Sequence, residues 1–172
     1  MTTPISHPFY LDCDTGIDDA LALAYLLASP QADVRGIGTV SGNVSAAVGA
    51  RNTLDLLQLA GHAHIPVALG AHDPQAGAFH GGAPHVHGAN GIGEVSLEAA
   101  AADLVPGTAA DMLVRLAHEH PGQLRILAIG PLTNIAEALR LDPELPRLVQ
   151  DITIMGGAAF APGNISPAAS GT

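Results

Sequence analysis

The sequence contains no lysine and no tryptophan, only one cysteine, and few aromatic residues. A lone cysteine, Cys13, excludes an intrachain disulfide and favours a reducing compartment. The net charge of −10 disfavours binding to nucleic acid or to an anionic membrane, but it does not oppose binding of a cation or a neutral sugar. No apolar run is long enough to span a membrane, and no basic-then-apolar leader begins the sequence. We therefore expect a soluble, cytoplasmic protein.

Strand-like and helix-like segments alternate along the 172 residues, of which 48% are hydrophobic. Short β-branched runs predict strands, and longer amphipathic segments between them predict helices. The expected strands are residues 8–13, 34–40, 65–69, 124–129 and 149–155. The expected helices are residues 17–28, 44–59, 108–119 and 132–141. This alternation is typical of an α/β fold with a mainly parallel, Rossmann-like sheet and helices on both faces, formed by a single domain over residues 1–172.

Four aspartates lie within eight positions at the end of the first expected strand and just beyond it, in the run FYLDCDTGIDDALAL of residues 9–23. Carboxylates crowded at the end of a buried strand repel one another and lose hydration unless a cation or hydrogen-bond donors compensate. Carboxylate oxygens suit a hard divalent ion such as Ca²⁺ or Mg²⁺ better than zinc. Because open α/β sheets bind ligands at the carboxyl ends of their strands, this turn is the expected site.

Simpler structural roles exist for several of these polar residues. Asp18 and Asp19 fall in the first turn of an expected helix, where the helix dipole favours carboxylates. Asn43 follows the second expected strand and would cap the helix expected at 44–59. If the two strands are parallel neighbours, Asn43 also lies beside the aspartates, so both roles remain open.

A long segment, residues 70–94, is rich in glycine and small residues and contains four histidines: His72, His80, His85 and His87. Zinc binding is disfavoured there because the segment has no cysteine, no helical His-x-x-x-His pair and no regular ligand spacing. A long loop in a compact domain is more often a binding loop or a lid. We expect an active-site flap with Gly91 and Gly93 as hinges.

Two chemistries suggested by the aspartates fit only part of the sequence. A calcium loop of the EF-hand type beginning at Asp12 would need glycine where Ile17 stands and glutamate where Leu23 stands. An aspartyl phosphatase resembling the haloacid dehalogenases, with Mg²⁺, would use Asp12 as nucleophile, Asp14 as acid/base and Ser41 as phosphate contact. That family needs a later lysine, which this chain lacks. The phosphatase remains an alternative.

Five segments, in order, resemble the inosine-uridine preferring nucleoside hydrolases. The first is LDCDTGIDDA (residues 11–20), where the family usually has proline at the position of Thr15. The others are VSGN (40–43), HGANGIG (87–93), GPLTNIA (130–136), and IMGG (154–157) followed by GN (163–164). The resemblance implies calcium-dependent hydrolysis of the N-glycosidic bond of small-molecule ribonucleosides, as in purine or pyrimidine salvage.

Residue roles implied by the resemblance follow position by position. Asp14 matches the general base and a Ca²⁺ ligand, Asp19 matches a second ligand, and the main-chain carbonyl of Thr133 matches a third. The implied ribose site consists of these residues: Asp18, Asn43, His87, Met155 and Asn164. Base preference is left open, and so is a homo-oligomer, since family members are often dimers or tetramers.

The sequence ends at Thr172, before several features that the resemblance implies. These are a Glu-Phe-Asn segment that binds ribose, a last aspartate ligand for calcium and a histidine near the leaving base. We therefore expect a truncated chain that lacks the C-terminal portion of the family fold, with weakened calcium binding and catalysis. A non-catalytic module that binds calcium or ribose is the second alternative.

Overall fold

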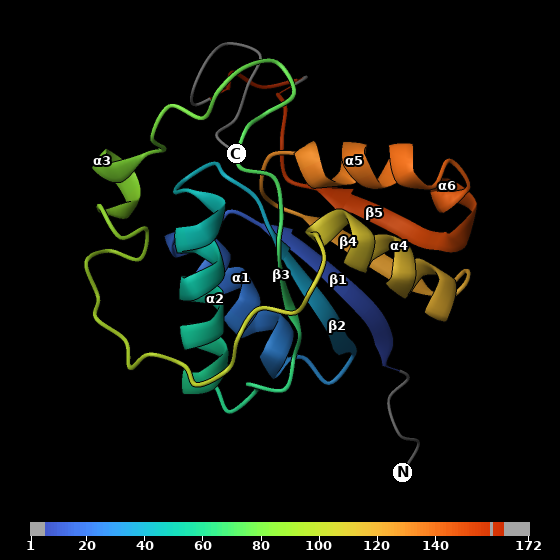
Figure 1. Ribbon diagram of the computed structural model, residues 1–172, viewed down its shortest axis with the longest axis horizontal. Helices are drawn as coiled ribbons and strands as arrows, with labels where there is room; N and C mark the ends of the chain where they lie inside the picture. Colours follow the sequence, from blue (N-terminus) through green and yellow to red (C-terminus); the bar gives the residue numbers. More distant parts are fainter. Residues whose placement is uncertain (1–5, 159, 164–172) are drawn as a thin grey trace.

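Strand β1 (His7–Cys13) lies in the middle of a five-stranded parallel sheet, as its apolar sequence predicts (Figure 1). The computed structural model describes residues 6–158 and 160–163. On one side of β1 lie β2 (Ala32–Thr39) and then β3 (Val67–Leu69), and on the other lie β4 (Leu124–Ala128) and then β5 (Val149–Ile154). Every strand pair in this order, β3-β2-β1-β4-β5, is parallel. The predicted α/β class and parallel sheet are confirmed.

Helices cover both faces of the sheet. Their bounds are α1 (Ile17–Ala28), α2 (Ala46–Leu59), α3 (Pro84–His87), α4 (Ala109–Glu119), α5 (Thr133–Leu141) and α6 (Leu145–Leu148). Two hydrophobic cores result, one between the sheet and α1 with α2, and the other between the sheet and α4 with α5 (Figure 1). Successive β1 residues serve opposite cores, Tyr10 with α4 and Leu11 with α1 and α2, because side chains alternate along a strand.

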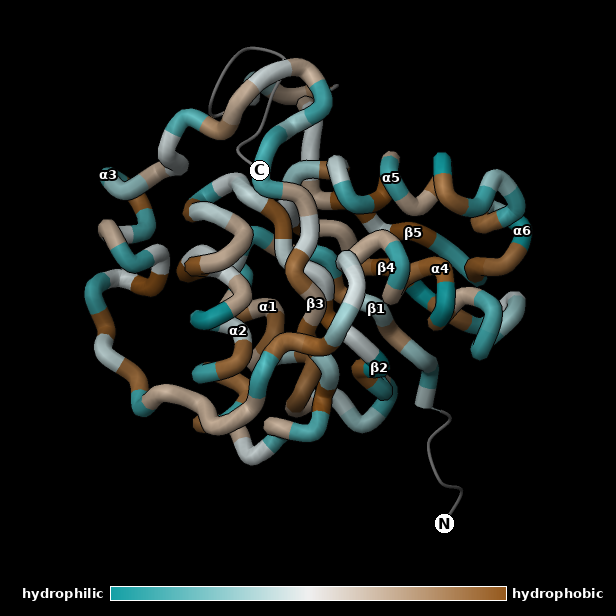
Figure 2. Tube along the Cα trace, in the orientation of Figure 1, coloured by the Kyte–Doolittle hydropathy of each residue, from teal (hydrophilic) through white to brown (hydrophobic). Residues whose placement is uncertain are grey.

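Hydrophobic residues gather in the strands and on the inward sides of the helices, as the hydropathy colouring shows (Figure 2). Aliphatic side chains fill both cores, and Tyr10 is the only aromatic residue among those that are fully buried in the described chain. The core therefore forms from Ala, Leu, Val and Ile, as the scarcity of aromatics in the sequence predicts.

The helix expected at residues 44–59 begins later, at Ala46. Its N-cap is Ser45, whose Oγ accepts a 3.3 Å hydrogen bond from the Val48 N–H. The prediction that Asn43 caps this helix is therefore wrong, because two more residues of turn separate Asn43 from the first helical residue. The short helices α3 and α6 were not expected, since four residues are too few to show a helical period.

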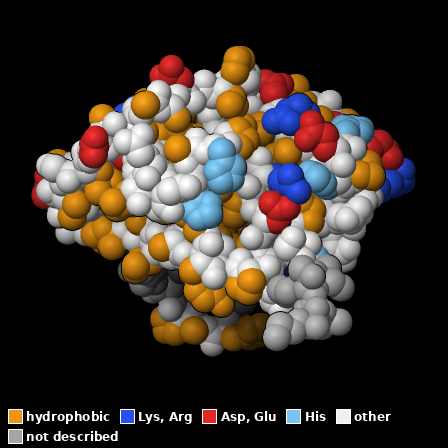
Figure 3. All heavy atoms as spheres, turned by 90° about the horizontal axis from the view of Figure 1, so that it is seen from below, with side chains coloured by type: hydrophobic (Ala, Val, Ile, Leu, Met, Phe, Trp, Pro, Cys, Tyr) orange, Lys and Arg blue, Asp and Glu red, His pale blue; other side chains and the backbone are white. Residues whose placement is uncertain are grey.

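On the face seen in Figure 3, basic side chains lie next to acidic ones. Uncharged and hydrophobic areas separate these charged groups from one another. Ion pairs join five of the six arginines to carboxylates: Arg35 with Asp33, Arg51 with Asp55, Arg115 with Glu119, Arg125 with Asp151, and Arg147 with Glu144. Such largely exposed pairs contribute little to stability. No helix within the described part of the chain is long and apolar enough to cross a lipid bilayer.

Candidate active site

The turn between β1 and α1 lies at the carboxyl edge of the sheet, beside the point where the strand order changes direction. Chain connections run from β1 to β2 and β3 on one side, and β4 and β5 lie on the other. Such a switch point is where open α/β sheets form a ligand-binding crevice. Three aspartates of the turn are almost completely buried, with exposed fractions of 0% for Asp12, 1% for Asp14 and 2% for Asp19. The fourth, Asp18, is exposed.

Asn43, from the turn after β2, joins the two aspartates predicted to bind metal. Its main-chain N–H donates a 2.6 Å hydrogen bond to Asp14 Oδ2, and its side-chain Nδ2 donates a 3.2 Å bond to Asp19 Oδ2. The Gly16 N–H donates a further 2.7 Å bond to Asp19 Oδ2. The predicted proximity of Asn43 to the aspartates is thus seen, and one oxygen of each carboxylate is held by donors.

The other oxygen of each buried carboxylate has no hydrogen-bond partner among the described residues: Asp12 Oδ2, Asp14 Oδ1 and Asp19 Oδ1. A buried anionic oxygen without a donor is costly, and a hard cation is the ligand that such oxygens suit. Asp14 and Asp19 therefore fit a divalent ion. Within residues 6–158 and 160–163, no group of three or more His, Cys, Asp or Glu side chains is arranged to hold a metal, so these two carboxylates need main-chain, substrate or water oxygens beside them.

Burial dominates the electrostatics of this turn. It raises the pKa of Asp14 to about 7, with the neighbouring Asp19 charge adding to the effect and the Asn43 N–H opposing it. Burial also raises the pKa of Asp12 to about 7 and raises that of Asp19 above its ordinary value. The site thus favours either protons or a bound cation.

Asn134 supports the site from α5 and was not singled out as a functional residue by the sequence. Its Nδ2 donates to Asp12 Oδ1 at 2.8 Å and to the Thr39 carbonyl at 3.0 Å, while its Oδ1 accepts from the Ala71 N–H at 2.8 Å. Tyr10 also donates to Asp12 Oδ1, at 3.3 Å. Asn134 therefore ties together the ends of β1 and β2 and the turn after β3. The only sequence signal was its place in the GPLTNIA segment.

His87, at the end of α3, lies over the start of α1. Its Nδ1 accepts a 3.1 Å hydrogen bond from the Ile17 N–H, and this Nδ1 is 3.8 Å from Asp18 Oδ1. The structure thus brings this flap histidine beside the aspartate turn.

The remaining predicted site residues lie at the same edge of the sheet or outside the described residues. Thr133 is the first residue of α5, and Met155 directly follows β5, where its N–H donates to the Ala128 carbonyl at 2.9 Å. Asn164 lies outside the described residues. The roles of these residues, like those of Asp14, Asp18, Asp19, Asn43 and His87, stay predictions.

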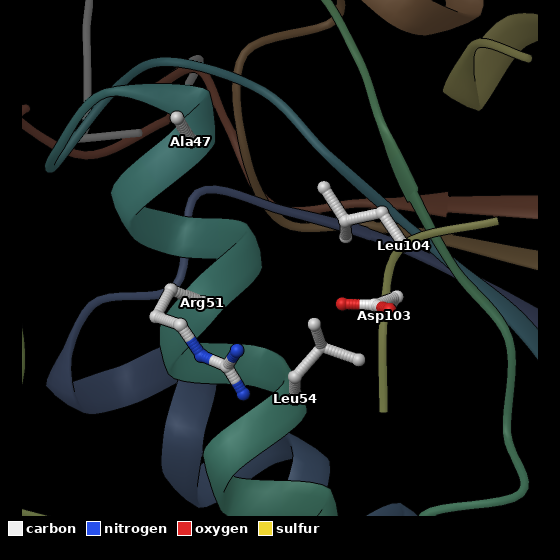
Figure 4. A pocket seen from close by; sticks show the side chains of 5 residues that line it. All are labelled: Ala47, Arg51, Leu54, Asp103 and Leu104. Atoms are coloured by element: carbon white, nitrogen blue, oxygen red, sulfur yellow. The ribbon is translucent and has the colours of Figure 1, made fainter. Parts of the chain in front are cut away.

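A cavity of about 420 Å³ lies elsewhere, between α2 and the segment before α4 (Figure 4). Its lining consists of Ala47, Arg51, Leu54, Asp103 and Leu104. None of the buried aspartates lines it, so it is separate from the aspartates at the carboxyl edge. The Arg51 guanidinium is already bonded to Asp55 and to the Ala100 carbonyl.

Comparisons with known proteins agree with this geometry. The model of the inosine-uridine preferring nucleoside hydrolases matches residues 9–170, which is nearly the whole chain. The chain belongs to this family. Uridine nucleosidase 1 of Arabidopsis thaliana is 42% identical over 159 residues, which cover 92% of this chain and 47% of that protein.

Solved nucleoside hydrolase structures share the fold. The plant nucleoside hydrolase PpNRh1 superposes with a TM-score of 0.91 at 38% identity, covering 96% of this chain and 52% of that one. A purine-preferring ribonucleoside hydrolase from Gardnerella vaginalis gives 0.90 at 33% identity, with 93% and 52% covered. The chain thus spans about half the length of the nucleoside hydrolases it matches. Family membership does not favour the aspartyl phosphatase alternative.

Proposed function

We propose that this nucleoside hydrolase family member cleaves the N-glycosidic bond of ribonucleosides, giving ribose and the free base. The observation that carries the proposal is the buried pair Asp14 and Asp19 at the carboxyl edge of the central strand. In each, one oxygen is held by donors and the other has no hydrogen-bond partner among the described residues. Membership of the family supplies the reaction class.

Calcium is the proposed cofactor, held by Asp14, Asp19 and the main-chain carbonyl of Thr133. When bound, a divalent cation supplies positive charge that orients a ribose diol and lowers the pKa of a nearby water. Two features of the residues support calcium binding. Carboxylate oxygens are ligands that suit Ca²⁺, and the Oδ1 atoms of Asp14 and Asp19 have no hydrogen-bond partner among the described residues. Asp12, fixed by Asn134, adds negative charge behind them.

Asp14 is the proposed general base. Its Oδ2 is engaged by the Asn43 N–H, and its buried Oδ1, which has no hydrogen-bond partner among the described residues, is the proposed contact for cation and water. In the reaction, Asp14 accepts a proton from water while the water oxygen bonds to the anomeric carbon, and the bond to the base breaks with its electron pair leaving on the base.

Other residues act on the sugar in this proposal. Asp18, Asn43 and His87 lie around the turn and offer polar atoms for ribose hydroxyls. The neighbouring carboxylates stabilise positive charge that develops on the sugar ring as the bond breaks. Uridine is the first substrate to test because the Arabidopsis relative is named a uridine nucleosidase, and inosine is the second because a structural neighbour is named purine-preferring.

The decisive assay measures ribose release from uridine and from inosine with added Ca²⁺. Asp14→Asn should lower the rate by roughly 100-fold or more, since loss of a general base typically costs that much. Asp103→Asn is the matched control because it makes the same change at an exposed carboxylate outside the site. No release by the unmutated protein, or equal rates for the two variants, would reject the proposal. Calcium-dependent stabilisation without ribose release would instead favour the binding module.

A further inference from the structure

A loop that carries His87 is anchored to the two helices that flank the aspartate turn. This loop, residues 87–95, is called the covering loop here. On α1, the Ile17 N–H donates to His87 Nδ1 at 3.1 Å. On α2, Asn52 Nδ2 donates to the Asn90 carbonyl at 2.8 Å. The loop is therefore attached at two points, one on α1 and one on α2.

Internal hydrogen bonds make the covering loop a unit. Asn90 Oδ1 accepts from the Ile92 N–H at 3.1 Å and from the Glu94 N–H at 2.9 Å, and Asn90 Nδ2 donates to the Val95 carbonyl at 2.9 Å. The Gly93 N–H donates to the His87 carbonyl at 2.8 Å. The Asn90 side chain thus holds residues 92–95, and Gly93 within that stretch is bonded to His87, so a contact that fixes Asn90 also restricts His87.

Asn52 is well placed to fix Asn90. Its side chain is 7% exposed and extends from α2, one residue before Thr53, whose hydroxyl is bonded to the Thr15 hydroxyl of the site turn at 2.8 Å. Losing the Asn52 amide would leave the half-buried Asn90 carbonyl without this donor, which weakens the attachment of the loop to α2.

Gly91 allows the covering loop to approach Val44 and Asn52 closely. It has φ of +85°, and a Cβ there would lie 2.7 Å from Val44 Cγ1 and 3.2 Å from Asn52 Nδ2. A side chain at this position would meet both a disfavoured backbone conformation and α2 itself. The glycine predicted to be a hinge is thus also a docking point.

We propose that Asn52 is a positioning residue that holds the covering loop, and with it His87, over the aspartate turn. The consequence for ribonucleoside cleavage rests on the function proposed above. The anchoring of the loop does not rest on the proposed function, because it depends only on contacts within this chain. The two parts can therefore be tested separately.

The first test is amide hydrogen exchange in Asn52→Leu, which has nearly the same shape but no amide. Exchange at Ile92, Gly93 and Glu94 should become roughly tenfold faster, the effect of losing one hydrogen bond to a buried partner. The matched control is Gln58→Met, since Gln58 on the same helix makes the same kind of bonds, to Ala99 and Ala101, beyond the covering loop. Equal exchange at those three amides in the two variants would overturn the anchoring.

The second test is kinetic. Asn52→Leu should raise KM for the ribonucleoside roughly tenfold and change kcat little, because an ordered loop contributes binding to ground state and transition state alike. Unchanged KM together with faster loop exchange would show that Asn52 is structural only. If the unmutated protein releases no ribose, the proposed function fails while the exchange result still decides the anchoring. If Asn52→Leu does not fold, Gly91→Ala tests the same contact by a substitution in the loop, because the added Cβ would push the loop away from Asn52. Unchanged exchange and unchanged KM in Gly91→Ala would reject the proposal.

Discussion

Asn43 donates its main-chain N–H to Asp14 Oδ2 over 2.6 Å, across the gap between the ends of β2 and β1. Asp14 Oδ1, the other oxygen of the proposed general base, is buried and has no hydrogen-bond partner among the described residues. It depends on the turn before Asn43, where Gly42 allows the carboxylate to lie against the main chain. Residues from two strands therefore set the position of one carboxylate.

Gly42→Ala should impair the site without unfolding the protein. A Cβ at Gly42 would lie 2.0 Å from Asp14 Oδ2, so the carboxylate must move from its present position. We expect ribose release to fall by roughly 100-fold, because small misplacements of a catalytic group cost that much. Gly49→Ala is the control: its Cβ meets no atom closer than 3.5 Å, and alanine favours the helix by roughly 0.5–1 kcal/mol. Similar activities for the two variants would contradict this reading.

Cation binding should be visible as stabilisation that is independent of activity. With Ca²⁺ at about 100 times its dissociation constant, the free energy of unfolding should rise by about 2.7 kcal/mol, measured by thermal or urea denaturation with and without chelator. Asp19→Asn should remove this gain because it replaces an unpartnered carboxylate oxygen. Asp18→Asn, one residue away and exposed, should retain most of it. Loss of the gain in both variants would point to general charge attraction and not to the proposed ligand.

Without a cation, stability should decrease as pH rises from about 4 to 7. The pKa of Asp12 is raised by burial from 3.8 to about 7, so the folded protein holds its proton more tightly than the unfolded chain. The contribution of the Asp12 carboxyl to the free energy of unfolding is fully present below pH 3.8 and is lost as pH rises through about 7. This contribution is on the order of 4 kcal/mol.

Asp12→Asn tests this linkage because an amide cannot ionise. The difference in unfolding free energy between variant and unmutated protein should shift in favour of the variant between pH 4 and pH 8, in urea titrations with chelator present. Asp111→Asn serves as a control of opposite sign, since bonds from Thr108 lower the pKa of that exposed carboxyl. The effect of Asp111→Asn on the pH dependence of the unfolding free energy should appear only below about pH 4. A pH-independent difference for Asp12→Asn would show that burial does not govern this carboxylate.

Most of the fold was readable from local pattern. Alternating apolar runs predicted all five strands, and the four longer helices were predicted within two residues at their starts. The error at α2 arose because Asn43 was expected to cap the helix, whereas Ser45, two residues later and also a good capping residue, does so in the structure. The helices α3 and α6 have only four residues each, too few for a periodic signal.

The sequence by itself determined the β1 strand, the four aspartates at its end and just beyond it, and the family to which the chain belongs, because these follow from contiguous residues. Only the tertiary structure decided which aspartates are buried, that Asn43 donates to Asp14 and Asp19, and that Asn134 holds Asp12. It also placed Asn52 under the covering loop. These contacts join residues 24 to 122 positions apart, and no local preference encodes them. They arise when the parallel strands align their carboxyl ends at one edge of the sheet.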